Sequence, residues 1–201
     1  MRIGCLQFAA QLGEVDSNVA LADSILASAA PRDLDLLVLP ELAFTGYNFK
    51  SLHAIAPFLE PTTSGPSSVW ARATAHNLKC TVVVGYPETV DVSAKWPTSP
   101  EYYNAAVAVS PSGATLANYR KTFLFTTDEK WALEGPDGFF SGEFDGLGGV
   151  ALGICMDLNP KSKGAGHGYV GVLGGETGAA GAEGGRGGDH CGAGESDGGG
   201  R

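Results

Sequence analysis

The apolar residues of this 201-residue chain stop almost completely at position 160. Beyond that point the only Leu, Ile, Val or Phe residues are Val170, Val172 and Leu173, and residues 161–201 hold 17 of the 30 glycines. Ordering the backbone of one residue costs about 1–2 kcal/mol, and a segment with so few side chains to bury cannot offset that cost. The sequence therefore predicts one globular domain over residues 1–160 and a glycine-rich, disordered tail over residues 161–201.

Charge and hydropathy exclude two classes of protein. The chain carries 13 Lys and Arg against 22 Asp and Glu, a net charge of −9, so we expect no nucleic-acid partner. Its apolar runs all fall well short of the roughly 18 residues that a spanning helix needs, so we expect no membrane association. The opening segment Ile3–Phe8 is interrupted by Gln7 and indicates a strand, not a signal peptide.

The cysteines indicate a reducing compartment. Cys5, Cys80, Cys155 and Cys191 are widely spaced, which matches neither a disulfide framework nor a zinc site. We therefore predict a cytoplasmic protein without a bound metal. Cys5 and Cys80 lie in apolar runs and are interpreted as buried core thiols.

Hydrophobic periodicity predicts alternating strands and helices over residues 1–160. Two helices are expected, over 18–30 and 67–78, because apolar residues recur there at helical spacing. Strands are expected over 3–8, 34–39, 80–85, 103–109, 114–119 and 149–154. This order is typical of an α/β or α+β layered architecture.

Three residues with reactive side chains follow predicted strands. Glu41, Lys121 and Cys155 each stand where a strand gives way to a loop, and functional residues of layered sheet folds gather at such places. A carboxylate can take the thiol proton, an ammonium group can stabilise an oxyanion, and a thiolate can attack a carbonyl carbon. Taken singly, each residue also has an ordinary structural reading: a capping Glu, a solvated Lys and a small buried Cys.

The segments around these residues resemble the three catalytic blocks of the nitrilase (carbon–nitrogen hydrolase) superfamily. They are Leu39-Pro40-Glu41-Leu42 with Thr45-Gly46-Tyr47, then Tyr119-Arg120-Lys121, then Gly153-Ile154-Cys155-Met156-Asp157. The resemblance implies a nitrilase-like α-β-β-α sandwich. It also implies an amidohydrolase in which Glu41 is the general base, Lys121 stabilises the transition state and Cys155 is the nucleophile, with no cofactor.

The same resemblance implies two further site residues. The backbone N–H of Met156 would contribute to the oxyanion site, and a second glutamate after the Lys would hold the substrate and the triad. Glu129 fits that place in the sequence, Asp128 and Glu134 are weaker candidates, and a plain surface charge is the alternative for Glu129.

Segments 44–49, 102–104 and 155–160 are similar to those of protein N-terminal asparagine amidohydrolases, a branch of this superfamily. The similarity implies a protein or peptide substrate with an N-terminal Asn, or alternatively Gln, deamidated in a protein-degradation (N-degron) pathway. A small-molecule amidase or carbamoylase of the same superfamily and a non-catalytic truncated product remain alternatives.

The likeness to the family ends near Pro160, whereas family members continue well past the cysteine. We therefore expect a truncated chain whose fold is incomplete at its C-terminal side. In the complete fold, pairing into a homo-oligomer is expected.

Overall fold

The computed structural model describes residues 1–95, 97–159 and 170–174. The helices in these residues are α1 (Val15–Ala29), α2 (Leu52–Ile55) and α3 (Pro66–Leu78). Single 3₁₀ turns are η1 (Ala56–Phe58), η2 (Ser93–Lys95), η3 (Asp128–Lys130) and η4 (Cys155–Leu158). The strands are β1 (Ile3–Cys5), β2 (Leu36–Val38), β3 (Glu60–Pro61), β4 (Thr81–Val90), β5 (Glu101–Val109), β6 (Thr115–Arg120), β7 (Phe140–Phe144), β8 (Gly148–Ile154) and β9 (Val170–Gly174).

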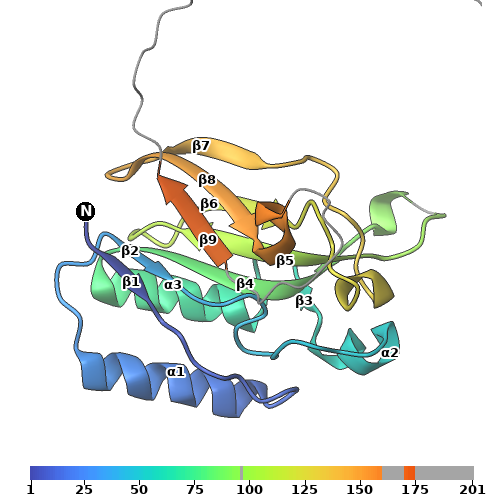
Figure 1. Cartoon of the computed structure of the whole chain (residues 1–201), viewed down its shortest axis with the longest axis horizontal. Coiled ribbons are helices and arrows are strands. Elements are labelled where there is room, and N and C mark those ends of the chain that lie inside the picture. The colour runs from blue at the N-terminus through green and yellow to red at the C-terminus, as the bar shows by residue number, and fades with distance from the viewer. Residues whose placement is uncertain (96, 160–169, 175–201) are drawn as a thin grey trace, which may run out of the picture.

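The strands form two sheets that lie one over the other (Figure 1). The first sheet has the order β1-β2-β4-β5-β6, and β3 pairs with β4 away from this path. Strands β1, β2 and β4 are parallel, whereas β5 runs antiparallel to both β4 and β6. The second sheet has the order β7-β8-β9 and is antiparallel. Strands β2, β4 and β6 therefore point the same way, and their carboxyl ends lie on the same side of the first sheet.

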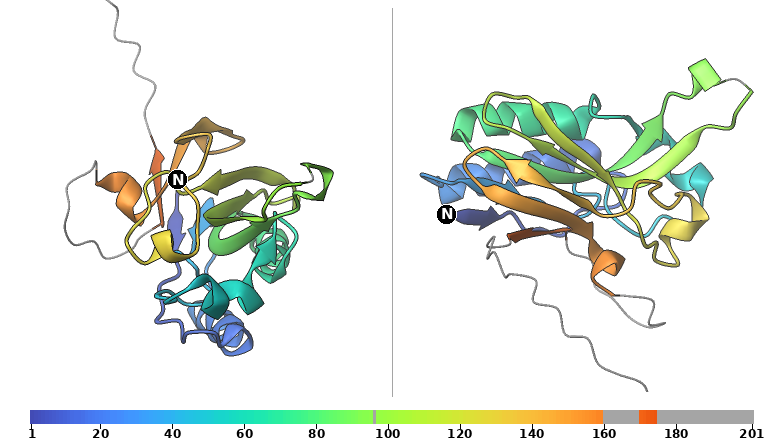
Figure 2. Two further views of the ribbon diagram at one scale, coloured as in Figure 1. Left: turned by 90° about the vertical axis from the view of Figure 1, so that its right-hand side faces the viewer. Right: turned by 90° about the horizontal axis from the view of Figure 1, so that it is seen from above.

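The apolar runs of the central strands are continuous because both faces of the first sheet are buried. Leu37 and Val82 belong to a core cluster with side chains of α1 and α3, whereas Leu36 and Val83 pack with side chains of β7 and β8. Figure 2 shows the helices on one side of the first sheet and the second sheet on the other. The layered α/β fold expected from the sequence is confirmed. In the described residues, the outer face of the second sheet has no covering helix.

The structure differs from the expected elements at several boundaries. Helix α1 begins at Val15, three residues before the predicted start; β4 continues to Val90, five residues past the predicted end, and β5 begins at Glu101, two residues before the predicted start. The short elements α2 and β3 were not predicted. Strand β7 was also missed, because Gly142 interrupts the alternation of its five residues.

One strand lies within the segment predicted to be disordered. Strand β9 contains the only Val and Leu residues of 161–201, and its backbone pairs with β8 from Val170 opposite Ile154 to Gly174 opposite Val150. The expectation is therefore wrong for these five residues, because β-branched residues suit an extended strand and a sheet edge offers unpaired backbone groups. The remainder of the predicted tail lies outside the described residues.

Strand β1 is at the edge of the first sheet and is largely exposed. Ile3 pairs with Leu36 and Cys5 with Val38, so both side chains lie on the face toward the second sheet. Ile3 is nevertheless 53% exposed and Cys5 is exposed, because the second sheet does not cover β1. The prediction of a buried Cys5 is therefore wrong, whereas Cys80 is buried as expected.

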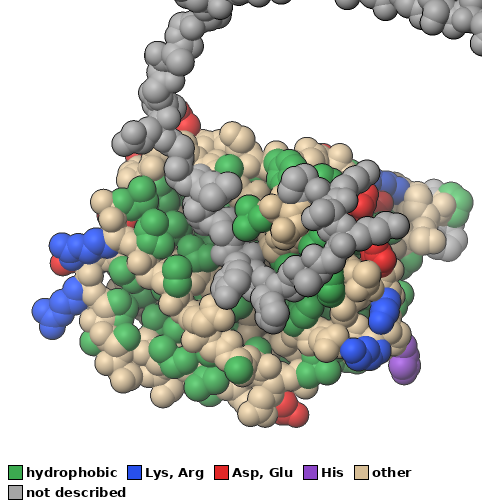
Figure 3. Space-filling model, in the orientation of Figure 1, with side chains coloured by type: hydrophobic (Ala, Val, Ile, Leu, Met, Phe, Trp, Pro, Cys, Tyr) green, Lys and Arg blue, Asp and Glu red, His purple; other side chains and the backbone are tan. Residues whose placement is uncertain are grey.

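The surface is mixed in character. On the face seen in Figure 3, hydrophobic side chains are scattered among uncharged ones, and charged side chains lie mainly toward the edges. Among the described helices, none combines the length and apolar character required to cross a bilayer.

Candidate active site

The three residues singled out in the sequence stand after three different strands. Glu41 follows β2, Lys121 follows β6, and Cys155 is the first residue of η4, directly after β8. The loop that carries Glu41 is attached to β4 on both sides, because Leu39 N–H donates to the Val83 carbonyl and Ala43 N–H donates to the Gly85 carbonyl. The first sheet thus supplies the carboxylate and the ammonium group, and the second sheet supplies the thiol.

Lys121 is the centre of a buried charged cluster. Its Nζ lies 2.7 Å from Oε1 of Glu41 and 2.6 Å from Oδ2 of Asp128. The Lys121 side chain is 0% exposed, and both carboxylates are buried with it. A buried ammonium group with two carboxylate partners has little freedom to rotate, so the cluster holds its donors in a fixed direction.

Asn104 joins the two carboxylates. This residue of β5 donates from Nδ2 to Oε1 of Glu41 at 2.6 Å and to Oδ1 of Asp128 at 3.3 Å. Its backbone carbonyl also accepts the N–H of Lys121. Sequence reasoning missed this role, although an Asn within the apolar run 103–109 was a signal, since a buried amide needs partners.

The cluster shifts the pKa values of its members. Burial raises the pKa of Glu41 above its usual range, and the nearby Lys121 only partly opposes this effect. Burial by itself lowers the pKa of Lys121, but Glu41 and Asp128 outweigh it and the pKa is raised. Lys121 is therefore charged at neutral pH, and Glu41 is a stronger base than an exposed carboxylate.

Cys155 is a buried thiol, 5% exposed, that lies within the field of this cluster. Burial raises the pKa of Cys155 to about 11; the Glu41 and Asp128 carboxylates raise it too, whereas Lys121 and the backbone N–H of Met156 lower it. At neutral pH the residue is therefore a thiol, and a base must remove its proton before or during nucleophilic attack.

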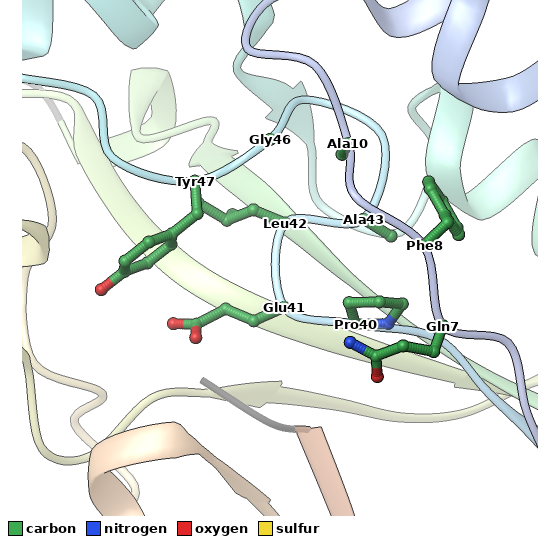
Figure 4. Close-up of a pocket in the computed structure, with 9 residues that line it drawn as sticks. All are labelled: Gln7, Phe8, Ala10, Pro40, Glu41, Leu42, Ala43, Gly46 and Tyr47. Atoms are coloured by element: carbon green, nitrogen blue, oxygen red, sulfur yellow. The ribbon is translucent and has the colours of Figure 1, made fainter. Parts of the chain in front are cut away.

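A cavity of about 200 Å³ opens beside Glu41. It is lined by Gln7, Phe8, Ala10, Pro40, Glu41, Leu42, Ala43, Gly46 and Tyr47. Figure 4 shows that the Glu41 carboxylate and the Tyr47 hydroxyl project toward the same side. The Tyr47 hydroxyl is buried and has no hydrogen-bond partner among the described residues, so it is available to a bound polar group.

The structure changes the assignment of the second acidic residue. Glu129 and Glu134 are both exposed, whereas Asp128 is buried against Lys121. Asp128, which the sequence ranked below Glu129, is thus the acidic residue that contacts Lys121, and a substrate-holding role for Glu129 stays a prediction. The η3 turn directs neighbouring side chains apart, and the N–H of Phe125 binds the Asp128 carboxylate, which holds that carboxylate toward Lys121.

In the part of the chain that the structure describes, no group of three or more His, Cys, Asp or Glu residues is arranged to hold a metal ion.

Known proteins are similar to this chain in sequence and in structure. The chain is 38% identical over 164 residues to the protein N-terminal amidase of Schizosaccharomyces pombe, covering 80% of this chain and 56% of that relative. A crystal structure of N-terminal amidase with Gln-Gly peptide matches with a TM-score of 0.68 and 31% identity, covering 79% of this chain and 40% of that one. The corresponding structure with Asn-Glu peptide matches with a TM-score of 0.68 and 32% identity, with the same coverage.

The chain thus spans about half the length of these relatives, 56% of the curated protein and 40% of the crystallised one. The sequence profile of the Carbon-nitrogen hydrolase family matches residues 2–159, which is most of the chain. The chain therefore belongs to the carbon–nitrogen hydrolase family.

Proposed function

We propose that this protein hydrolyses a linear carboxamide, with Cys155 as nucleophile, Glu41 as general base and Lys121 as oxyanion stabiliser. The observation that carries the proposal is the buried Lys121–Glu41 pair, 2.7 Å apart, whose charges act on the pKa of the Cys155 thiol. Asp128 and Asn104 support the pair, because the Asp128 carboxylate also contacts Lys121 and the Asn104 amide also donates to Glu41.

The proposed reaction follows from the protonation states of the site. The Cys155 sulfur attacks the amide carbon while Glu41 takes the thiol proton, and the developing oxyanion is stabilised by Lys121 and the Met156 N–H. The C–N bond then breaks, Glu41 gives the proton to the leaving ammonia, and a thioester remains on Cys155. Glu41 next takes a proton from water, whose oxygen attacks the thioester. The C–S bond then breaks, Glu41 returns the proton to the Cys155 sulfur, and the carboxylic acid leaves.

The substrate that we propose is a peptide whose first residue is Asn, with Gln as a second substrate. The solved N-terminal amidases hold Gln-Gly and Asn-Glu peptides, which supports this class over other amides. Deamidation of an N-terminal Asn produces an N-terminal Asp. We therefore include in the proposal a place in a protein-degradation pathway in the cytoplasm. The free thiols of Cys5, Cys80 and Cys155 suit the reducing conditions of that compartment.

The test is to incubate the full chain with Asn-Glu and Gln-Gly, with N-acetylated Asn-Glu, and with a small ω-amide. Ammonia release and conversion of the first residue to its acid are followed by mass spectrometry. We expect turnover of the two free peptides, its loss in Cys155→Ser and its retention in Cys5→Ser.

Two outcomes would overturn the proposal. Turnover of the small amide alone would point to a small-molecule amidase of the same family. Absence of ammonia from every substrate would show that this chain has no amidohydrolase activity.

A further inference from the structure

Asp157 lies two residues after Cys155 and is not part of the charged cluster around Lys121. Its side chain, 8% exposed, accepts three hydrogen bonds. Oδ2 accepts from the Ile154 N–H at 2.8 Å and from the Tyr119 hydroxyl at 2.6 Å. Oδ1 accepts from the Phe123 N–H at 2.8 Å. A carboxylate that accepts from three donors on its two oxygens is strongly held in place.

The three donors come from both sides of the proposed site. Ile154 is the residue directly before Cys155, on the second sheet. Tyr119 and Phe123 stand two residues before and two residues after Lys121, at the end of β6 on the first sheet. One carboxylate therefore connects the segment that carries the thiol with the segment that carries the ammonium group, across the two sheets.

Cys155 needs such a support, because its backbone has φ +50°, in the left-handed region that residues with a side chain rarely adopt. A conformation of this kind persists only where the surrounding structure determines it. The bond from the Ile154 N–H to Oδ2 of Asp157 closes the turn over Cys155 and so restrains the residue in this conformation. Tyr119 is itself restrained, because its hydroxyl also lies 3.0 Å from Oγ1 of Thr122.

We propose that Asp157 is a positioning residue that fixes the Cys155 thiol relative to the Lys121–Glu41 pair. The effect on catalysis rests on the proposed function, whereas the effect on the position of the thiol does not. Catalytic groups must be held to within about 0.5 Å, and a displacement of 1 Å costs about 100-fold in rate. Asp157 touches no reacting atom, and its effect is transmitted through Ile154 and through the segment around Lys121.

The test measures how strongly the Glu41 charge shifts the pH midpoint of Cys155 alkylation. The rate of alkylation with iodoacetamide is recorded as a function of pH. Labelling is quantified for each cysteine-containing peptide by mass spectrometry, with the exposed Cys5 as internal reference. Because the Glu41 carboxylate raises the pKa of Cys155, Glu41→Gln lowers the pH midpoint of Cys155 alkylation. This shift is determined in three backgrounds: the unaltered chain, Asp157→Asn, and Tyr119→Phe.

We expect the Glu41→Gln shift to be smaller in Asp157→Asn and in Tyr119→Phe, because the thiol is then no longer held close to the Lys121–Glu41 pair. Any constant effect of the lost Asp157 charge cancels, since each shift is measured within one background. Tyr119→Phe alters no charge and removes one of the three donors, so it serves if Asp157→Asn does not fold. Asp145→Asn, the same change at an exposed position, is expected to leave the shift unaltered.

An equal shift in all three backgrounds would overturn the inference, because a merely structural Asp157 does not alter the coupling between Glu41 and the thiol. Peptide turnover is measured in parallel, where Asp157→Asn is expected to lower kcat by about tenfold or more with little change in KM. If the alkylation shifts follow expectation but no variant releases ammonia, the proposed function fails and the positioning role stands.

Discussion

Nζ of Lys121 lies 2.7 Å from Oε1 of Glu41, although 80 positions separate the two residues in the chain. The pair exists because β2 and β6 end on the same side of the first sheet. Lys121 directly follows β6, and Glu41 lies in the loop that follows β2. Removing the two charges from water is costly. The Asn104 amide and the Asp128 carboxylate, which is the second partner of Lys121, help to offset that cost.

The first prediction concerns the stability of the cluster. Lys121→Met leaves Glu41 and Asp128 buried without a counter-charge, so we expect the free energy of unfolding to fall by about 3–5 kcal/mol. Urea denaturation followed by circular dichroism measures the change. Adding Asp128→Asn in that background should recover part of the loss. The exposed Lys130→Met is the control, and an equally large effect there would contradict the explanation.

The second prediction concerns the pH dependence of the thiol. The pKa of Cys155 is raised from 9.0 to about 11, so the reactive thiolate is scarce at neutral pH and increases as the pH rises through that value. Iodoacetamide should therefore label Cys155 much more slowly than Cys5 at neutral pH, with a midpoint near 11. A midpoint at or below 9.0 would show that Lys121 dominates over burial and the carboxylates.

The third prediction distinguishes the roles of two adjacent acidic residues, Asp128 and Glu129. Because the Asp128 carboxylate raises the pKa of Cys155, Asp128→Asn should lower the pH midpoint of Cys155 alkylation. It should also reduce amide turnover by about tenfold, since Lys121 loses one of its two anchors. Glu129→Gln is the matched control and should change neither quantity, because Glu129 is exposed. Loss of turnover in Glu129→Gln alone would restore the role that the sequence suggested for it.

The fourth prediction concerns the loop that carries Glu41. A Cβ added at Gly85 would lie 2.7 Å from the Pro40 carbonyl oxygen and 2.8 Å from Cα of Glu41, both of them backbone atoms. Gly85→Ala must therefore displace that loop. We expect a loss of about 1–3 kcal/mol in the free energy of unfolding, together with reduced turnover.

Gly4→Ala is the control for this change. Its Cβ would lie 3.2 Å from the ends of the Leu34 and Leu37 side chains, which can move aside, so a much smaller effect is expected. If the two variants behaved alike in urea denaturation and in turnover, the close approach of β4 to the Glu41 loop would not explain the sensitivity.

Local patterns were sufficient for most of the fold. The run 34–39 alternates between the two core clusters, Leu37 toward the helices and Leu36 toward the second sheet, and a run without polar residues predicted such burial on both faces. Local patterns did not predict strand β7 or the position of β1 at the edge of the sheet. Pairing with a distant strand decides whether a short, glycine-interrupted segment is extended, and coverage by another layer decides whether Cys5 is buried.

The sequence by itself determined the layered fold class, the family resemblance and the three positions Glu41, Lys121 and Cys155. Only the tertiary structure decided that Asp128 and not Glu129 reaches Lys121, that Asn104 joins the two carboxylates, and that Asp157 connects the two sheets. The physical reason is that strand periodicity and motif order are local properties of the chain. The direction of a side chain in a turn, and the partners of a buried polar group, depend on elements brought together from distant parts of the chain.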